Sequence, residues 1–189
     1  EFAQKNEWNF EKELEWGLLQ YPEHQQAQAF FKAVNRFYLS RPELWEVDFS
    51  WEGFEWISND DYQQSVIAFR RKAKDGRELV CVCNFVPVQR ENYCIGIPIR
   101  GVWSEVFSSD QKEFGGAGVT NGKEIETQDV PMHGCEQSVS LTLPGCSVFF
   151  LECVKKTPKR VRHTATKKAA AKARTGSRSR TKKAGAKTP

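Results

Sequence analysis

Short apolar runs recur about every ten residues between residues 54 and 153, and this spacing constrains the fold more than any other feature. The breaks between runs carry turn residues, such as Asp75-Gly76, a pair typical of tight hairpins. Runs of this length at this spacing are typical of antiparallel sheets packed face to face. The sequence therefore predicts a β-sandwich, with strands at residues 54–57, 66–71, 79–85, 93–97, 102–107, 125–130, 139–143 and 148–153.

A helical period precedes these strands. Between residues 23 and 39, apolar side chains recur at a spacing of three to four, which is typical of an amphipathic helix. Pro22 suits the first turn of that helix, and Arg41-Pro42 ends it, because the residue before proline is pushed out of helical geometry. We expect one further short turn at residues 42–45. The helix has an apolar side that needs a surface to cover.

Charge divides the chain into two unlike parts. Of the 28 Lys and Arg residues, fourteen lie in residues 155–189, whereas all 24 Asp and Glu residues precede them. The first 154 residues therefore carry a formal charge of −10, and residues 155–189 carry +14. The basic segment has no apolar period and cannot bury enough surface to offset its ordering entropy. We predict that it is a disordered tail.

The six cysteines lie mostly within apolar runs and lack the spacing of zinc ligands. We expect buried, reduced thiols, and hence a cytoplasmic protein. Cys81 and Cys83 share one face of a strand but are poorly placed for a disulfide. No apolar run is long enough to span a membrane, and no metal site or cofactor is predicted.

A glycine-rich stretch, Gly115-Gly116-Ala117-Gly118 with Asn121-Gly122, separates two predicted strands. One interpretation is a phosphate-binding loop. The stretch lacks the Gly-Lys-Ser/Thr ending of such loops and opens no predicted helix, which favours a plain connection.

Several separate motifs occur in an order typical of one enzyme family. They are Glu1-Phe2-Ala3-Gln4, Asn6-Glu7-Trp8-Asn9, Leu14-Glu15-Trp16-Gly17-Leu18-Leu19, Tyr21-Pro22-Glu23-His24-Gln25, Gly53-Phe54-Glu55-Trp56-Ile57, Cys83-Asn84-Phe85-Val86-Pro87-Val88 and Arg90-Glu91-Asn92-Tyr93. Together they resemble the C-terminal part of bacterial 1,4-α-glucan (glycogen) branching enzymes, over residues 1 to about 153. These enzymes belong to the α-amylase superfamily.

The resemblance implies a mainly β fold with three parts. Residues 1–45 would be the last loop and helix of a catalytic β/α barrel, and residues 46–154 an antiparallel β-sandwich domain. Residues 155–189 would be the basic tail. The apolar side of the helix would then face a barrel sheet that this chain does not contain.

The resemblance also implies an activity for the parent protein. Branching enzymes cleave α-1,4-glucan chains and transfer them to a 6-hydroxyl, forming α-1,6 branches in glycogen. The reaction is a retaining glycosyl transfer that needs paired carboxylates. The motifs carrying the family's catalytic carboxylates are absent from this sequence, so no catalytic residue is assigned. We expect the 189 residues alone to be inactive.

Three residues are candidates for substrate contact. Glu7, Trp8 and Trp16 would lie in a loop on the active face of the barrel, where the tryptophans could stack on sugar rings. The alternative is that these tryptophans fill the junction between barrel and sandwich. The other four tryptophans are assigned mainly to core and domain packing, with an exposed glucan platform as the alternative: Trp45, Trp51, Trp56 and Trp103.

The basic tail resembles histone-like nucleic-acid-binding tails and departs from the family pattern. It contains no aromatic residue, so any contact with a polyanion would be electrostatic and indifferent to sequence. The alternative is a tether or a solubilising appendage. The candidate contact residues are Lys155, Lys156, Lys159, Arg160, Lys167, Lys168, Arg178, Arg180, Lys182 and Lys183.

Two other functions stay open at this point. One is another enzyme of the α-amylase superfamily, because the C-terminal sandwich is shared architecture. The other is a free-standing module that binds glucan or a polyanion. The apolar side of the predicted helix argues against the module, since it would be exposed without a barrel.

Overall fold

A computed structural model describes residues 1–158, and the expectations for residues 159–189 lie outside the described residues. The single α-helix of the described part, α1 (Pro22–Ser40), agrees with the predicted helix. Pro22 occupies its first turn, and the chain turns extended at Arg41, as the following proline requires. Four short 3₁₀ turns accompany it: η1 (Trp16–Gln20), η2 (Pro42–Leu44), η3 (Trp51–Gly53) and η4 (Lys112–Phe114).

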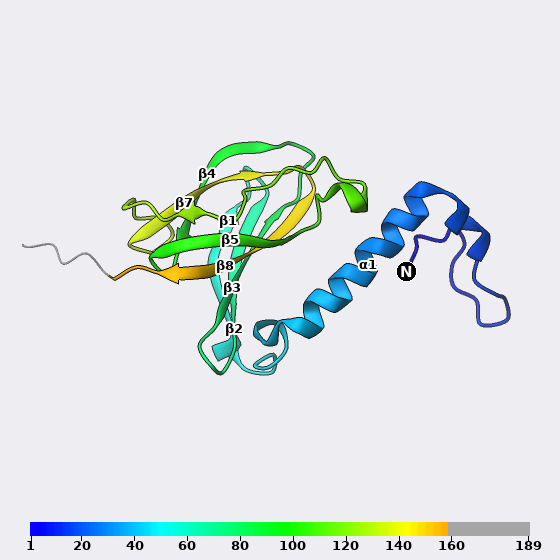
Figure 1. Cartoon of the computed structure of the whole chain (residues 1–189), viewed down its shortest axis with the longest axis horizontal. Helices are drawn as coiled ribbons and strands as arrows, with labels where there is room; N and C mark the ends of the chain where they lie inside the picture. The colour runs from blue at the N-terminus through cyan, green and yellow to red at the C-terminus, as the bar shows by residue number, and fades with distance from the viewer. Residues whose placement is uncertain (159–189) are drawn as a thin grey trace, which may run out of the picture. The chain divides into compact units, whose positions relative to one another are not determined.

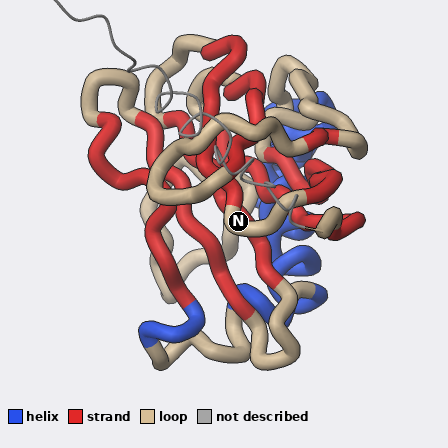
Figure 2. Tube along the Cα trace, turned by 90° about the vertical axis from the view of Figure 1, so that its left-hand side faces the viewer, coloured by secondary structure: helices blue, strands red, loops and turns tan. Residues whose placement is uncertain are grey.

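All eight predicted strands are present, and all their pairings are antiparallel. Six form one sheet in the order β1-β2-β3-β8-β5-β6, and β4 pairs with β7 in a second sheet. Figures 1 and 2 show the strands gathered together, with α1 to one side of them. The strands are β1 (Phe54–Asp61), β2 (Val66–Lys72), β3 (Glu78–Asn84), β4 (Arg90–Ile97), β5 (Gly101–Ser108), β6 (Ile125–Glu126), β7 (Gln137–Leu143) and β8 (Ser147–Lys156).

β6 is much shorter than the predicted strand at residues 125–130. After Glu126 the chain leaves the six-stranded sheet, and Gln128 bridges Ser138 of β7 in the other sheet. The predicted strand at residues 125–130 is therefore cut short, because the chain passes from one sheet to the other after Glu126. β8 extends to Lys156, two residues into the segment assigned to the tail.

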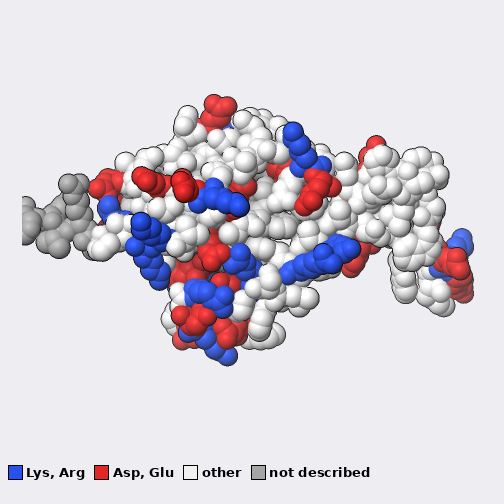
Figure 3. Space-filling model, in the orientation of Figure 1, with Lys and Arg blue, Asp and Glu red and all other residues white. Residues whose placement is uncertain are grey.

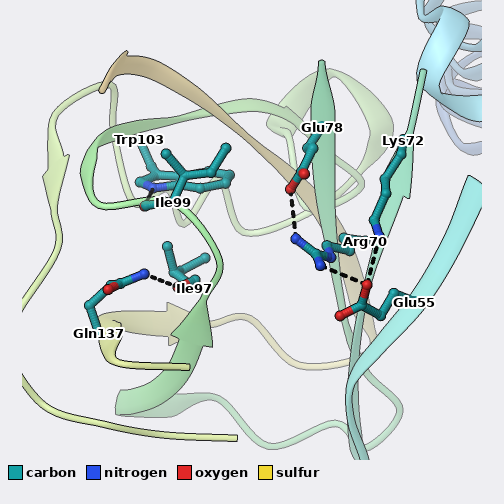
Figure 4. A network of polar contacts seen from close by, with 8 residues as sticks. All are labelled: Glu55, Arg70, Lys72, Glu78, Ile97, Ile99, Trp103 and Gln137. Atoms are coloured by element: carbon teal, nitrogen blue, oxygen red, sulfur yellow. Dashed lines mark hydrogen bonds and ion pairs between the residues drawn. The ribbon is translucent and has the colours of Figure 1, made fainter. Parts of the chain in front are cut away.

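The core lies between the two sheets and consists of apolar residues from the predicted strands. β3 lies at the centre of the larger sheet, as its continuous apolar run predicts, and Val80 and Val82 are fully buried. Trp103 is also fully buried, and its indole Nε1 donates to the carbonyl of Ile99 at 3.0 Å (Figure 4). The buried core residues are Val66, Ala68, Val80, Val82, Ile95, Ile97, Trp103, Ile125, Val139, Leu141, Leu143, Phe149 and Leu151.

A network of charges joins the first three strands (Figure 4). The Arg70 guanidinium bonds the Glu55 carboxylate at 2.6 Å and the Glu78 carboxylate at 3.0 Å, and Lys72 bonds Glu55 at 2.6 Å. The hydrogen bonds from Lys72 and Arg70 lower the pKa of Glu55. The network thus links neighbouring strands through oppositely charged side chains.

The apolar side of α1 is covered in part by this chain itself. The Phe37 ring stacks on Phe107 of β5 at 4.9 Å and meets Phe150 of β8 at 5.1 Å. Nearer the start of the helix, Phe30 meets Phe114 of η4 at 5.5 Å. Other apolar residues of α1, including Phe31, are exposed. The helix therefore packs on the β domain through Phe30 and Phe37 and leaves further apolar side chains exposed.

The cysteines are only partly as predicted. All six are free, and Cys81 is buried, but Cys146 is exposed because it occupies the turn before β8 with a positive φ of 47°. Cys81 and Cys83 share one face of β3, with their sulfurs 3.8 Å apart. The hydrogen bond with Cys83 and burial both raise the pKa of Cys81.

Within residues 1–158, no helix is both long enough and apolar enough to cross a membrane.

Candidate functional site

The candidate site is the loop of residues 4–15, which precedes η1 and α1. Its two ends are held together by Glu15, whose carboxylate accepts from the backbone N–H of Lys5 at 3.1 Å and from the side-chain amide of Asn6. The amide group of Gln4 completes the closure, since it accepts from the Glu15 N–H at 3.3 Å and donates to the Asn6 carbonyl at 2.9 Å. The base of the loop is thus fixed by polar contacts.

The tip of this loop carries exposed aromatic rings. Trp8 is 74% exposed, Phe10 is 80% exposed, and the Glu7 carboxylate is also exposed. Asn9 organises the tip, because its side chain accepts from the Glu11 N–H at 2.9 Å. The two predicted residues therefore project from a closed loop. Phe10 was not predicted as part of the site. Its position two residues after Trp8 in the sequence was the feature that could have indicated it.

Trp16 occupies a different position, at the base of the loop where η1 begins. Its ring stacks on Phe2 at 5.4 Å with an interplanar angle of 25°, and it remains 56% exposed. Phe2 is buried, and its carbonyl accepts from Nδ1 of His24 in α1 at 2.8 Å. These contacts attach the start of the chain to α1. Among the described residues, no ring contact or hydrogen bond joins Trp16 to Glu7 or Trp8.

The loop provides a surface for contact and not a catalytic centre. Glu7 has no hydrogen bond or ion pair within residues 1–158, so nothing there positions it as a proton donor or a nucleophile. The described part of the chain also contains no group of three or more His, Cys, Asp or Glu side chains that could hold a metal ion. What the arrangement offers is exposed rings on a loop with a fixed base, which suits stacking on an extended ligand.

A second group of exposed aromatic residues lies where η2 leads into β1. Trp51 is 83% exposed, and Trp45 and Trp56 are 42% and 48% exposed. These three rings therefore do not lie in a core within residues 1–158, and domain packing and a glucan platform stay as the interpretations for them, whereas Trp103 is a core residue as predicted. For Trp56 the physical reason is position: β1 is an edge strand, and the Trp56 ring meets those of Phe54 and Phe69 at the same edge of the sheet.

The glycine-rich stretch is an ordered connection built around Asp110. The buried Asp110 carboxylate accepts from the N–H groups of Ala117 at 3.0 Å and Val119 at 2.8 Å, and its carbonyl accepts from Gly118 at 2.7 Å. Gly116 lies so close to the Asp110 backbone that a Cβ there would clash. Because a protein carboxylate occupies these N–H groups, the loop does not form a phosphate cradle.

The comparisons with known proteins agree with this architecture. Residues 56–154 match the family described as "Alpha amylase, C-terminal all-beta domain". The relatives include proteins named 1,4-alpha-glucan branching enzyme from Aromatoleum aromaticum and Aquifex aeolicus. Each is 45% identical, over 151 and 153 residues respectively, and each match covers 80% of this chain and 24% of the relative.

A relative of the same name, from Synechococcus sp., is 43% identical over 173 residues, which cover 91% of this chain and 22% of that protein. The chain thus spans about a quarter of the length of these relatives. The resemblance to the C-terminal part of bacterial 1,4-α-glucan branching enzymes is confirmed by these matches. On the match of residues 56–154, and on the antiparallel sheets that those residues form, the chain belongs to the family of the α-amylase C-terminal all-β domain.

Proposed function

We propose that this chain is the C-terminal portion of a glycogen branching enzyme, a glycosyltransferase of the α-amylase superfamily. The parent protein would cleave α-1,4-glucan chains and transfer them to a 6-hydroxyl to form α-1,6 branches in the cytoplasm. The observation that carries this proposal is the 45% identity to proteins named as branching enzymes, over 80% of the chain. Shared architecture alone would not select this activity among enzymes of the superfamily.

In this proposal, residues 1–45 complete a catalytic barrel and residues 46–154 form the β domain. The uncovered apolar residues of α1 support this division, since exposed apolar surface of this kind marks a contact with another protein part. The catalytic carboxylates would lie outside this chain, so the 189 residues alone would not branch glucan. A retaining transfer requires two carboxyl groups about 5 Å apart across the substrate, which the loop around Glu7 does not provide.

Glu7, Trp8 and Trp16 would contact α-glucan in the parent protein. The support is the exposure of both rings, together with the fixed base of the loop that carries Trp8. Stacking of an aromatic ring contributes about 0.5–1.5 kcal/mol, which corresponds to roughly a 2- to 12-fold change in affinity. The Trp8 ring packs against no other ring of the described chain, so its removal should leave the fold intact.

The test uses the native protein that carries this chain, with amylose as substrate and α-1,6 linkages measured by NMR. We expect branching by the native protein and none by the 189-residue chain. Trp8→Ala should raise KM several-fold without changing Tm, whereas the control Tyr62→Ala, which removes an exposed ring outside the loop, should leave KM unchanged. A native protein that forms no α-1,6 linkages would refute the branching assignment, and an unchanged KM in Trp8→Ala would refute the role of the loop.

A second candidate function is a glucan-binding module, favoured by the exposed Trp51 and Trp56 near the start of the β domain. This function predicts that the 189-residue chain alone is retarded in a gel that contains amylose. It also predicts that Trp51→Ala removes the retardation. Retardation that survives this substitution would exclude Trp51 as the platform.

A further inference from the structure

Residues 155–189 form the most strongly charged part of the chain, and the proposed branching activity does not use them. They contain fourteen Lys and Arg residues, no Asp or Glu, and no Phe, Trp or Tyr. We propose that this segment binds double-stranded nucleic acid through its phosphates, without regard to base sequence. The inference is independent of the proposed branching activity.

The described beginning of the segment is fixed and exposed. Lys155 and Lys156 pair with Val102 and Gly101 of β5 at the end of β8, and the Thr157 N–H donates to the carbonyl of Arg100 at 2.9 Å. Both lysines are exposed, and neither forms an ion pair with any described residue. The first two cations of the segment are therefore available to an external anion.

The rest of the described surface is a poor site for a polyanion. The first 154 residues carry a formal charge of −10, and six of their fourteen basic residues already form ion pairs with carboxylates. Figure 3 accordingly shows acidic and basic side chains interspersed on the face of the molecule in view. Attraction to a polyanion would thus come from residues 155–189 alone, while the remainder repels it.

The composition of the segment favours a duplex over other anions. Single strands are held largely by aromatic stacking, which this segment cannot provide. A duplex carries about one negative charge per 1.7 Å of axis, which matches a dense run of cations. Membrane anchoring combines basic residues with buried apolar surface, but Val161 is the only Val, Leu, Ile, Met or aromatic residue in residues 155–189.

The segment also lies partly within a match to another protein. A match that covers 91% of a 189-residue chain exceeds the 158 described residues, so the match to the Synechococcus protein includes part of residues 159–189. Part of the basic segment is therefore aligned with a protein named as a branching enzyme.

The salt dependence of binding gives a quantitative test. Each phosphate contact contributes about −0.9 to the slope of log K against log salt concentration, so fourteen cations set a limit of about −13. With half of them engaged, the slope would be about −6, and affinity would fall by at least roughly 10³-fold between 50 and 200 mM salt.

The experiment measures fluorescence anisotropy of a 30-base-pair mixed-sequence DNA duplex with the native protein that carries this chain. One variant lacks residues 159–189. A matched control keeps the full length and replaces the twelve Lys and Arg residues of that segment with Gln. Branching activity is measured on the same proteins, so that failure of the proposed function is seen separately from failure of this inference.

We expect the native protein to bind two unrelated duplexes equally, with the steep salt dependence given above. Both variants should lose at least 100-fold in affinity and keep their branching activity. No duplex binding at 50 mM salt, or unchanged binding by either variant, would overturn the inference. Tighter binding to phosphatidylserine vesicles, or to single strands of the same length, would overturn it in favour of a membrane or a single-stranded partner.

Discussion

Replacing Asp110 with alanine tests whether this side chain organises the glycine-rich connection. The Asp110 carboxylate accepts from two backbone N–H groups, at 3.0 and 2.8 Å, and is almost fully buried. A buried N–H group that loses its acceptor costs about 1–3 kcal/mol of stability. The cost for the two N–H groups together should stay below twice this figure, because water can reach part of this loop and replace the lost acceptor. We therefore expect Asp110→Ala to lower the free energy of unfolding by about 2–3 kcal/mol.

Urea unfolding of the 189-residue chain, followed by tryptophan fluorescence, measures this change. With a slope of about 2 kcal/mol/M, the midpoint should fall by about 1–1.5 M. Asp110→Asn keeps one acceptor oxygen, so its midpoint should lie between those of the wild type and the alanine variant. The control Asp60→Ala removes an exposed carboxylate that has no side-chain hydrogen bond within residues 1–158, and it should change little. A midpoint for Asp110→Ala within 0.2 M of wild type would show that the loop does not depend on this carboxylate.

Three further predictions concern the β domain. Trp103→Ala removes a fully buried ring and should cost about 3–5 kcal/mol in urea unfolding, whereas Trp51→Ala should stay within about 0.5 kcal/mol of wild type. The pKa of Glu55 is lowered in the folded state, so its contribution is present above the unfolded pKa and is lost as pH falls. Glu55→Gln should therefore be less stable than wild type at pH 7, and the difference in unfolding free energy should shrink as pH falls through the lowered pKa of Glu55; a difference that stays constant as pH is lowered would contradict this linkage. Exposed Cys146 should react fastest with a thiol reagent, and Cys146→Ser should abolish that phase, while the buried thiol of Cys81 should react only on unfolding.

The strands could be predicted because their apolar runs are local features of the sequence. The run from Leu79 to Cys83 indicated a central strand, and β3 lies between β2 and β8. The length of β6 could not be predicted in this way, since it ends where Gln128 bridges a strand of the other sheet. That bridge depends on the place of β7 in space, which no local pattern encodes.

Burial of the tryptophans could not be predicted from residue type. Trp103 lies in β5, which has a neighbour on each side and one face on the core. Trp56 lies in β1, at the edge of the same sheet, and remains about half exposed. The same residue type therefore has opposite surroundings in two strands of one sheet. The difference arises from strand order, which long-range pairing determines.

For the candidate site, the sequence indicated the residues but not the way in which they are held. Glu15 closes the loop by accepting from backbone groups nine and ten positions earlier, a contact with no periodic signature. Closure fixes where the tip projects, yet it leaves Trp8 74% exposed and without a ring contact among the described residues. A tryptophan that served only to fill a junction inside this chain would be covered by it. The exposed ring on a fixed base thus favours contact with something outside the chain, either glucan or another part of the parent protein. The KM and the Tm of Trp8→Ala together distinguish these two partners, because loss of a glucan contact would raise KM at an unchanged Tm, whereas loss of a packing contact would lower Tm.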